Sequence, residues 1–131
     1  MSRSTIDCSL DTCVLIDLIK GRKDAEKVVS RFAHLSISHV VLGELLLGGY
    51  KASNPQETDK ILNSLEGITI LSGNALTSAI YAEMRFELEK QGGLIPQNDI
   101  WIAAASIQAD VPIITRDDHF RRIPKLRVAE Y

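Results

Sequence analysis

The chain has 131 residues, 45% of them hydrophobic and 24% charged, values typical of one ordinary globular domain. We therefore expect residues 1–131 to form a single domain with a sizeable core. A net charge of −2 excludes a uniformly basic surface for nucleic acid but leaves room for a local basic patch. The first residues contain no apolar signal segment, and no apolar run reaches the about 20 residues of a membrane span. The composition thus predicts a cytoplasmic protein that makes no contact with a membrane.

The cysteines and histidines do not form a recognisable zinc motif. Cys8 and Cys13 match no zinc-binding spacing, and we expect both to be small core residues that stay reduced. The histidines are scattered, with no two at ligand spacing on one helix: His34, His39 and His119. The sequence therefore predicts no site for a soft metal ion.

In the N-terminal part of the chain, short apolar strands alternate with helices. Alternating apolar residues predict a strand over Thr5–Leu10, after which Asp11 caps a helix that ends at Gly21. An amphipathic helix is expected at Lys23–Leu35, and a short strand at Leu35–Ser38.

Glu44 is the only charge in the apolar stretch "VVLGELLLGG", residues 40–49. If this stretch is a helix, leucine or valine occupies every face, so we expect a helix that is buried all round. Leu46 and Leu47 would then pack in the core or in an interface, where Tyr50 could join them. An unpartnered buried carboxylate is unfavourable and tends to take up a proton. We therefore expect a group beside Glu44 that compensates the negative charge of its carboxylate.

The C-terminal part continues the alternation. Residues 56–67 predict a helix, residues 68–72 a strand, and Asn74 caps a long helix that ends near Gln91. After a loop containing Pro96, residues 98–110 predict another buried helix, 111–115 a strand, and 126–130 a weaker strand. Strands that alternate with helices predict an α/β domain with a mostly parallel sheet and helices on both faces.

Three further acids lie in apolar surroundings: Asp11, Asp99 and Asp117. Taken singly, the first two could be helix caps and the third a turn residue. However, ligands of parallel sheets bind beyond the carboxyl ends of the strands, and Asp11 and Asp117 each follow a strand. Glu44 lies early in the helix after its strand, and Asp99 begins the helix that leads to the strand at 111–115. We expect the four carboxylates to converge there and to bind Mg²⁺ or Mn²⁺, which prefer oxygen ligands.

At these residues the sequence resembles the PIN-domain ribonucleases, and among them the VapC toxins of bacterial and archaeal toxin–antitoxin pairs. The matching pieces are "LDTCVLIDLIKG", "SHVVLGELLLG", "PQNDIWIAAAS" and "IITRDDHF". The resemblance implies a three-layer α/β/α domain with a mostly parallel sheet of about five strands. It also implies a Mg²⁺- or Mn²⁺-dependent endoribonuclease, a hydrolase with this set of site acids: Asp11, Glu44, Asp99 and Asp117.

The same resemblance extends to supporting residues and partners. It implies that Thr115 supports the acidic site and that the fourth acid is Asp117 rather than Asp118. It implies an RNA substrate, a small VapB-like antitoxin that blocks the site, and a homodimer. Basic side chains near the fourth acid are candidate contacts to RNA phosphates: Arg116, Arg121, Arg122, Lys125 and Arg127.

Three alternative functions are weighed against the toxin. A PIN-fold nuclease of RNA processing or decay, without an antitoxin, fits the sequence equally well. A receiver-like metal-binding signalling domain needs a phosphoacceptor aspartate after the third strand, where "ITILSGN" has none. A phosphatase of the haloacid-dehalogenase type needs a second aspartate two residues after the first, where Cys13 stands.

Overall fold

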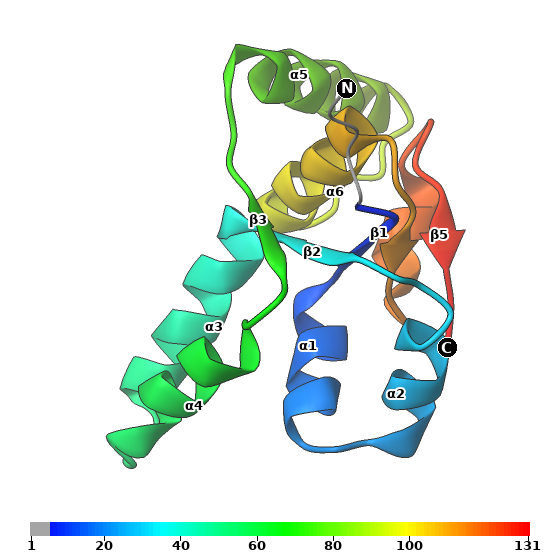
Figure 1. Cartoon of the computed structure of the whole chain (residues 1–131). Coiled ribbons are helices and arrows are strands. Elements are labelled where there is room, and N and C mark those ends of the chain that lie inside the picture. Colours follow the sequence, from blue (N-terminus) through cyan, green and yellow to red (C-terminus); the bar gives the residue numbers. More distant parts are fainter. Residues whose placement is uncertain (1–5) are drawn as a thin grey trace.

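The centre of the computed structural model is a parallel sheet with five strands in the order β3-β2-β1-β4-β5 (Figure 1). The structure describes residues 6–131, so Thr5 of the predicted first strand lies outside the described residues. The strands are β1 (Cys8–Leu10), β2 (Leu35–Ser38), β3 (Thr69–Leu71), β4 (Ile113–Ile114) and β5 (Val128–Ala129). The predicted α/β class and mostly parallel sheet of about five strands are confirmed.

Helices cover both faces of the sheet. They are α1 (Thr12–Ile19), α2 (Lys23–Val29), α3 (His39–Lys51), α4 (Gln56–Ser64), α5 (Ala75–Lys90) and α6 (Gln97–Ala109), with a 3-10 helix η1 (Asp118–Arg122) before β5. In Figure 1, α1 to α4 lie on one side of the sheet, and α5 and α6 lie on the other. Right-handed crossovers account for this division, because the chain runs outward from β1 to β3 and then returns to β4.

The core lies between the central strands and the helices on each face. Leu10 of β1 and Ile113 of β4 are fully buried, as expected for strands covered on both faces. On α6, Ile100, Ile102 and Ala103 are buried against the sheet. Within residues 6–131, no helix combines the length and the apolar character needed to cross a membrane.

The prediction that the helix containing Glu44 is buried all round is wrong. Its buried residues are Val41, Leu45 and Gly49, which recur every four residues and so form one face. Leu47 is 53% exposed on another face. Leucine content alone does not bury a helix face, and here Glu44 lies at the margin of the buried face rather than inside the core.

The predicted second helix is also too long, because α2 ends at Val29 rather than at Leu35. A distant side chain redirects the backbone: the carboxylate of Asp7 accepts hydrogen bonds from the backbone N–H groups of Ala33 (2.8 Å) and His34 (3.0 Å). The chain then enters β2, in register with β1.

Candidate functional site

Asp11 begins the site at the carboxyl end of β1, where it also caps α1 as predicted. Its side chain accepts hydrogen bonds from the Thr12 backbone N–H (2.8 Å), the Thr115 hydroxyl (2.8 Å) and the Cys13 thiol (3.3 Å). Asp11 is only 6% exposed, and all three donors are neutral. Burial raises the pKa of its carboxyl group and the carboxylate of Asp117 adds to the rise, while the hydrogen bonds oppose it.

Thr115, directly after β4, joins two of the predicted site acids. Its hydroxyl donates to Asp11 and accepts the backbone N–H of Asp117 (2.9 Å). Asp117 in turn caps η1 by accepting the backbone N–H of His119 (2.9 Å). The hydroxyl therefore fixes one carboxylate and the backbone that carries the other, which is the kind of contact that the family resemblance implies.

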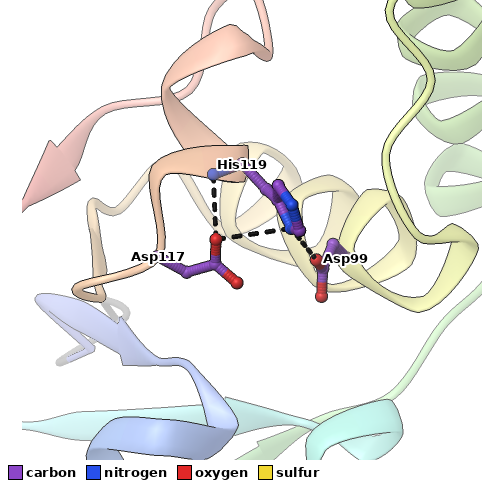
Figure 2. Close-up of side chains that lie close together, drawn as sticks. All are labelled: Asp99, Asp117 and His119. Carbon is purple, nitrogen blue, oxygen red and sulfur yellow. Dashed lines mark hydrogen bonds and ion pairs between the residues drawn. The ribbon is translucent and has the colours of Figure 1, made fainter.

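Asp99 enters from α6 and faces His119 (Figure 2). Pro96 precedes α6 without a side-chain cap, so the alternative role of Asp99 as a helix cap is wrong. The Nδ1 atom of His119 lies 3.2 Å from Asp99 Oδ2 and 3.3 Å from Asp117 Oδ1. Burial raises the pKa of Asp99 to about 6; the hydrogen bond from His119 opposes this rise, and the carboxylates of Asp11 and Asp117 add to it.

Glu44 reaches the same edge of the sheet from α3. Its two carboxylate oxygens accept hydrogen bonds from the Thr12 hydroxyl (2.6 Å) and the Asn98 amide (3.3 Å). These donors lie beside Asp11 and Asp99 in the chain, so Glu44 links the first turns of α1 and α6. The compensating groups that the structure provides for Glu44 are therefore neutral hydrogen-bond donors.

No lysine or arginine in the described part of the chain pairs with the site acids Asp11, Glu44, Asp99 and Asp117. One oxygen each of Asp99 and Asp117 and one nitrogen of His119 lie within 4.8 Å of one another, close enough to share a metal ion. Carboxylate oxygens are the ligands that Mg²⁺ and Mn²⁺ prefer, so the two carboxylates of this group fit the predicted cation.

Each arginine predicted to bind RNA has an intramolecular partner. Arg116 forms a 2.8 Å ion pair with Asp17. Arg121 pairs with Glu130, and Arg122 donates to the backbone carbonyl of Gly93. Arg116 and Arg121 keep 46% and 54% of their side chains exposed, so contact with RNA stays a prediction for them.

Two residues near the acids have roles that the sequence reasoning missed. No histidine pair marks His119 in the sequence, because its neighbours are aspartates, one of them on another helix, α6. Its place two residues after Asp117, at the start of a turn, was the available signal. Cys13 was predicted to be a core residue, but it contacts Asp11, and burial and that carboxylate raise the pKa of its thiol to about 11.

Comparisons with known proteins agree with this geometry. The PIN domain family matches residues 9–126. A Ribonuclease VapC from Rickettsia bellii is 31% identical over 124 residues (91% of this chain, 92% of that protein). Ribonuclease VapC2 from Haemophilus influenzae is 30% identical over 128 residues (93% and 96%).

Solved structures show the same likeness. The VapBC2 complex from Rickettsia felis, bound to a DNA fragment from its promoter, contains a chain with a TM-score of 0.87 and 28% identity, covering 96% of this chain and 98% of that one. The VapBC-1 structure from nontypeable Haemophilus influenzae matches with a TM-score of 0.83 and 29% identity, covering 95% and 97%. This chain therefore belongs to the PIN-domain family.

Proposed function

We propose that this chain is a Mg²⁺- or Mn²⁺-dependent endoribonuclease that acts as the toxin of a toxin–antitoxin pair. The observation that carries the proposal is that acids meet at the carboxyl edge of the sheet, with His119 beside two of them and no lysine or arginine partner among the described residues. In the proposed site the metal is held by Asp11, Glu44, Asp99 and Asp117. The likeness to proteins named Ribonuclease VapC supports the reaction and the toxin role.

In the proposed reaction, the site residues hold the metal ion at which water hydrolyses an RNA phosphodiester. A bound Mg²⁺ or Mn²⁺ supplies activation of that water and offsets negative charge on the phosphate. Three hydrogen-bond donors fix the carboxylate of Asp11. Asp99 lies in the first turn of α6, and the Glu44 carboxylate is held by donors in the first turns of α1 and α6. Cys13 does not act as a nucleophile, because its pKa of about 11 keeps the thiol protonated. The family resemblance implies that metal-activated water would attack the phosphate in line, with no covalent enzyme intermediate.

Contacts outside the acids would hold the substrate. Arg116, Arg121 and Arg122 lie on or beside η1, near Asp117, where exposed guanidinium groups can contact RNA phosphates. Their intramolecular ion pairs and hydrogen bonds would have to be shared with or exchanged for the phosphates.

A groove next to Glu44 supports the proposal that this chain binds a protein partner. It has a volume of about 290 Å³, lies between α1, α3 and α4, and is lined by Ile16, Leu45 and Ile61 together with Glu44. An apolar segment of a VapB-like antitoxin would cover the apolar wall and reach the acids. Leu47 and Tyr50, 53% and 79% exposed on α3, support a further contact surface, such as that of a homodimer.

Induction in a bacterial host tests this function. We expect the wild-type chain to arrest growth and to create new RNA 5′ ends, and Asp99→Asn to do neither at equal protein level. Co-expression of the neighbouring antitoxin gene should restore growth. RNA cleavage without growth arrest would favour the processing or decay nuclease, and wild-type cleavage by Asp99→Asn would remove Asp99 from the mechanism.

A further inference from the structure

His119 provides a nitrogen atom at the acidic cluster. Its Nδ1 atom lies 3.2 Å from an oxygen of Asp99 and 3.3 Å from an oxygen of Asp117. Figure 2 shows that Asp99 comes from α6, whereas Asp117 and His119 come from the start of η1. Two elements distant in the chain thus bring two oxygens and one nitrogen together.

The local structure holds the imidazole in this position. The backbone N–H of His119 donates to Asp117 Oδ1 (2.9 Å), which fixes the first turn of η1. The next residue, Phe120, is fully buried and anchors η1 in the core. The His119 side chain remains 45% exposed, so its ring is open to ions from solvent.

The distances match those between neighbouring ligand atoms around a metal ion. With metal–ligand bonds of about 2.1 Å, adjacent ligands lie about 3.0 Å apart in an octahedral site and about 3.4 Å apart in a tetrahedral one. The two observed separations, 3.2 and 3.3 Å, fall between these values. Since one atom of each of the three residues also lies within 4.8 Å of the other two, a small cation between them can reach Nδ1 and both carboxylates.

We propose that His119 is a metal ligand through Nδ1, together with Asp99 and Asp117, and that it favours first-row transition ions over Mg²⁺. The inference rests on the divalent-metal site of the proposed function and deepens it. Mg²⁺ is bound mainly through carboxylates, phosphates and water, whereas first-row transition ions accept imidazole readily. His119 thus sets which metal the site selects.

The test is direct metal binding, with Mn²⁺ as a paramagnetic probe and Mg²⁺ as its competitor. We expect the pulsed electron paramagnetic resonance spectrum of bound Mn²⁺ to show coupling to an imidazole nitrogen in the wild type. His119→Ala should remove this coupling and weaken Mn²⁺ binding more than Mg²⁺ binding, and it should weaken binding of Zn²⁺, which accepts imidazole more readily, about ten- to a hundredfold. His119→Asn, which offers an amide oxygen near the position of Nδ1, should also lack the coupling but should bind Mg²⁺ better relative to Mn²⁺.

Control variants separate failure of this inference from failure of the proposed function. His39→Ala should keep the nitrogen coupling, because the Nδ1 atom of His39 lies instead 3.3 Å from the backbone carbonyl of Leu71. Asp99→Asn should weaken binding of both Mn²⁺ and Mg²⁺. If the wild type binds Mn²⁺ and Asp99→Asn does not, but His119→Ala keeps the wild-type spectrum and affinity, His119 is no ligand. If Asp99→Asn binds Mn²⁺ as tightly as the wild type, the proposed metal site itself is wrong.

Discussion

Helix α1 has a buried aspartate near each end, and the two differ in how their charge is compensated. Asp17, in the last turns of the helix, is 3% exposed; it forms a 2.8 Å ion pair with Arg116 and accepts a 2.5 Å hydrogen bond from the Tyr131 hydroxyl. Asp11, at the start, is 6% exposed and is held only by neutral donors. The same side chain at similar burial thus has an internal cation in one place and none in the other.

In the proposed function, this difference separates a structural carboxylate, Asp17, from a metal-binding one, Asp11. A buried carboxylate is tolerated when a cation and hydrogen bonds compensate it. The Arg116 guanidinium compensates Asp17 and lies 5.8 Å from the centre of the Tyr131 ring, so this cluster is complete without a ligand. At the other end, the Asp117 carboxylate raises the pKa of Asp11, and both of these carboxylates raise the pKa of Asp99; this repulsion favours a cation from solution.

The largest expected effect is the loss of activity in Asp11→Asn. Removing a metal-binding charge should lower the rate of RNA cleavage by about a thousandfold or more, equivalent to about 4 kcal/mol of transition-state stabilisation. The matched variant Asp17→Asn should keep the rate within about tenfold, because Asp17 contacts none of the four site acids. Single-turnover cleavage of a defined RNA by folded proteins measures both. Equal losses in the two variants would contradict the distinction.

Arg116→Gln should destabilise the protein, because it leaves Asp17 buried without its cation. Because the Arg116 side chain is 46% exposed and Tyr131 still donates to Asp17, the free energy of unfolding should fall by about 1–3 kcal/mol, less than for a fully buried pair, measured by urea denaturation. The double variant with Asp17→Asn should recover part of the loss. An unchanged unfolding midpoint would show that the ion pair is not structural. If Arg116 also contacts RNA, the dependence of log affinity on log salt should weaken by about one unit.

Asp99→Asn should stabilise the metal-free protein in a pH-dependent way. The pKa of Asp99 is raised from 3.8 to about 6, so the folded state holds its proton more tightly than the unfolded state does. Wild-type stability should therefore fall as the pH rises from about 4 to about 6, and the neutral amide of the variant avoids this fall. Thermal melting in EDTA should give the variant an advantage of roughly 1–3 kcal/mol above pH 6, and little or none below pH 4. Parallel curves for the two proteins would contradict the raised pKa.

The smallest effect is expected for Asp118→Asn, next to the fourth acid. The Asp118 side chain is 93% exposed and lies 3.7 Å from Arg121, an ion pair worth less than about 1 kcal/mol. Cleavage should change by less than about twofold, whereas Asp117→Asn should lose at least about tenfold. Kinetics of the two variants at one metal concentration decide between them, and the reverse order would mean that Asp118 is the fourth acid.

Local patterns made much of the fold predictable. Asn74 forms a capping box with Thr77, and the long helix begins at Ala75 as its sequence indicates. The end of α2 was missed because it depends on Asp7, whose contact lies far away in the chain. The exposed face of α3 was missed because apolar composition does not state which face the sheet covers.

For the site as well, residues marked by local sequence patterns could be predicted, whereas contacts between distant residues could not be predicted from those patterns. Asp11, Asp99 and Asp117 were proposed because strand ends and helix starts are visible in sequence, and Glu44 because it is the only charge in an apolar stretch. Their distant partners needed more than local patterns: the family resemblance alone indicated that Thr115 supports the acids, and nothing in the sequence indicated that Tyr131 reaches Asp17 across most of the chain. His119 was missed for the same reason, since the oxygen of Asp99 that it faces belongs to another helix.

Metal-dependent thermal melting of the wild type, Asp17→Asn and Asp99→Asn tests most directly whether the uncompensated acids bind a cation. Each protein is melted in EDTA and then through a titration with Mn²⁺ or Mg²⁺ at constant ionic strength. We predict that metal stabilises the wild type and Asp17→Asn alike, by about 2.7 kcal/mol at a hundredfold excess over the dissociation constant. Asp99→Asn should gain much less. A wild type with no shift at metal concentrations that support cleavage, or an equal shift in Asp99→Asn, would contradict a metal site at these carboxylates.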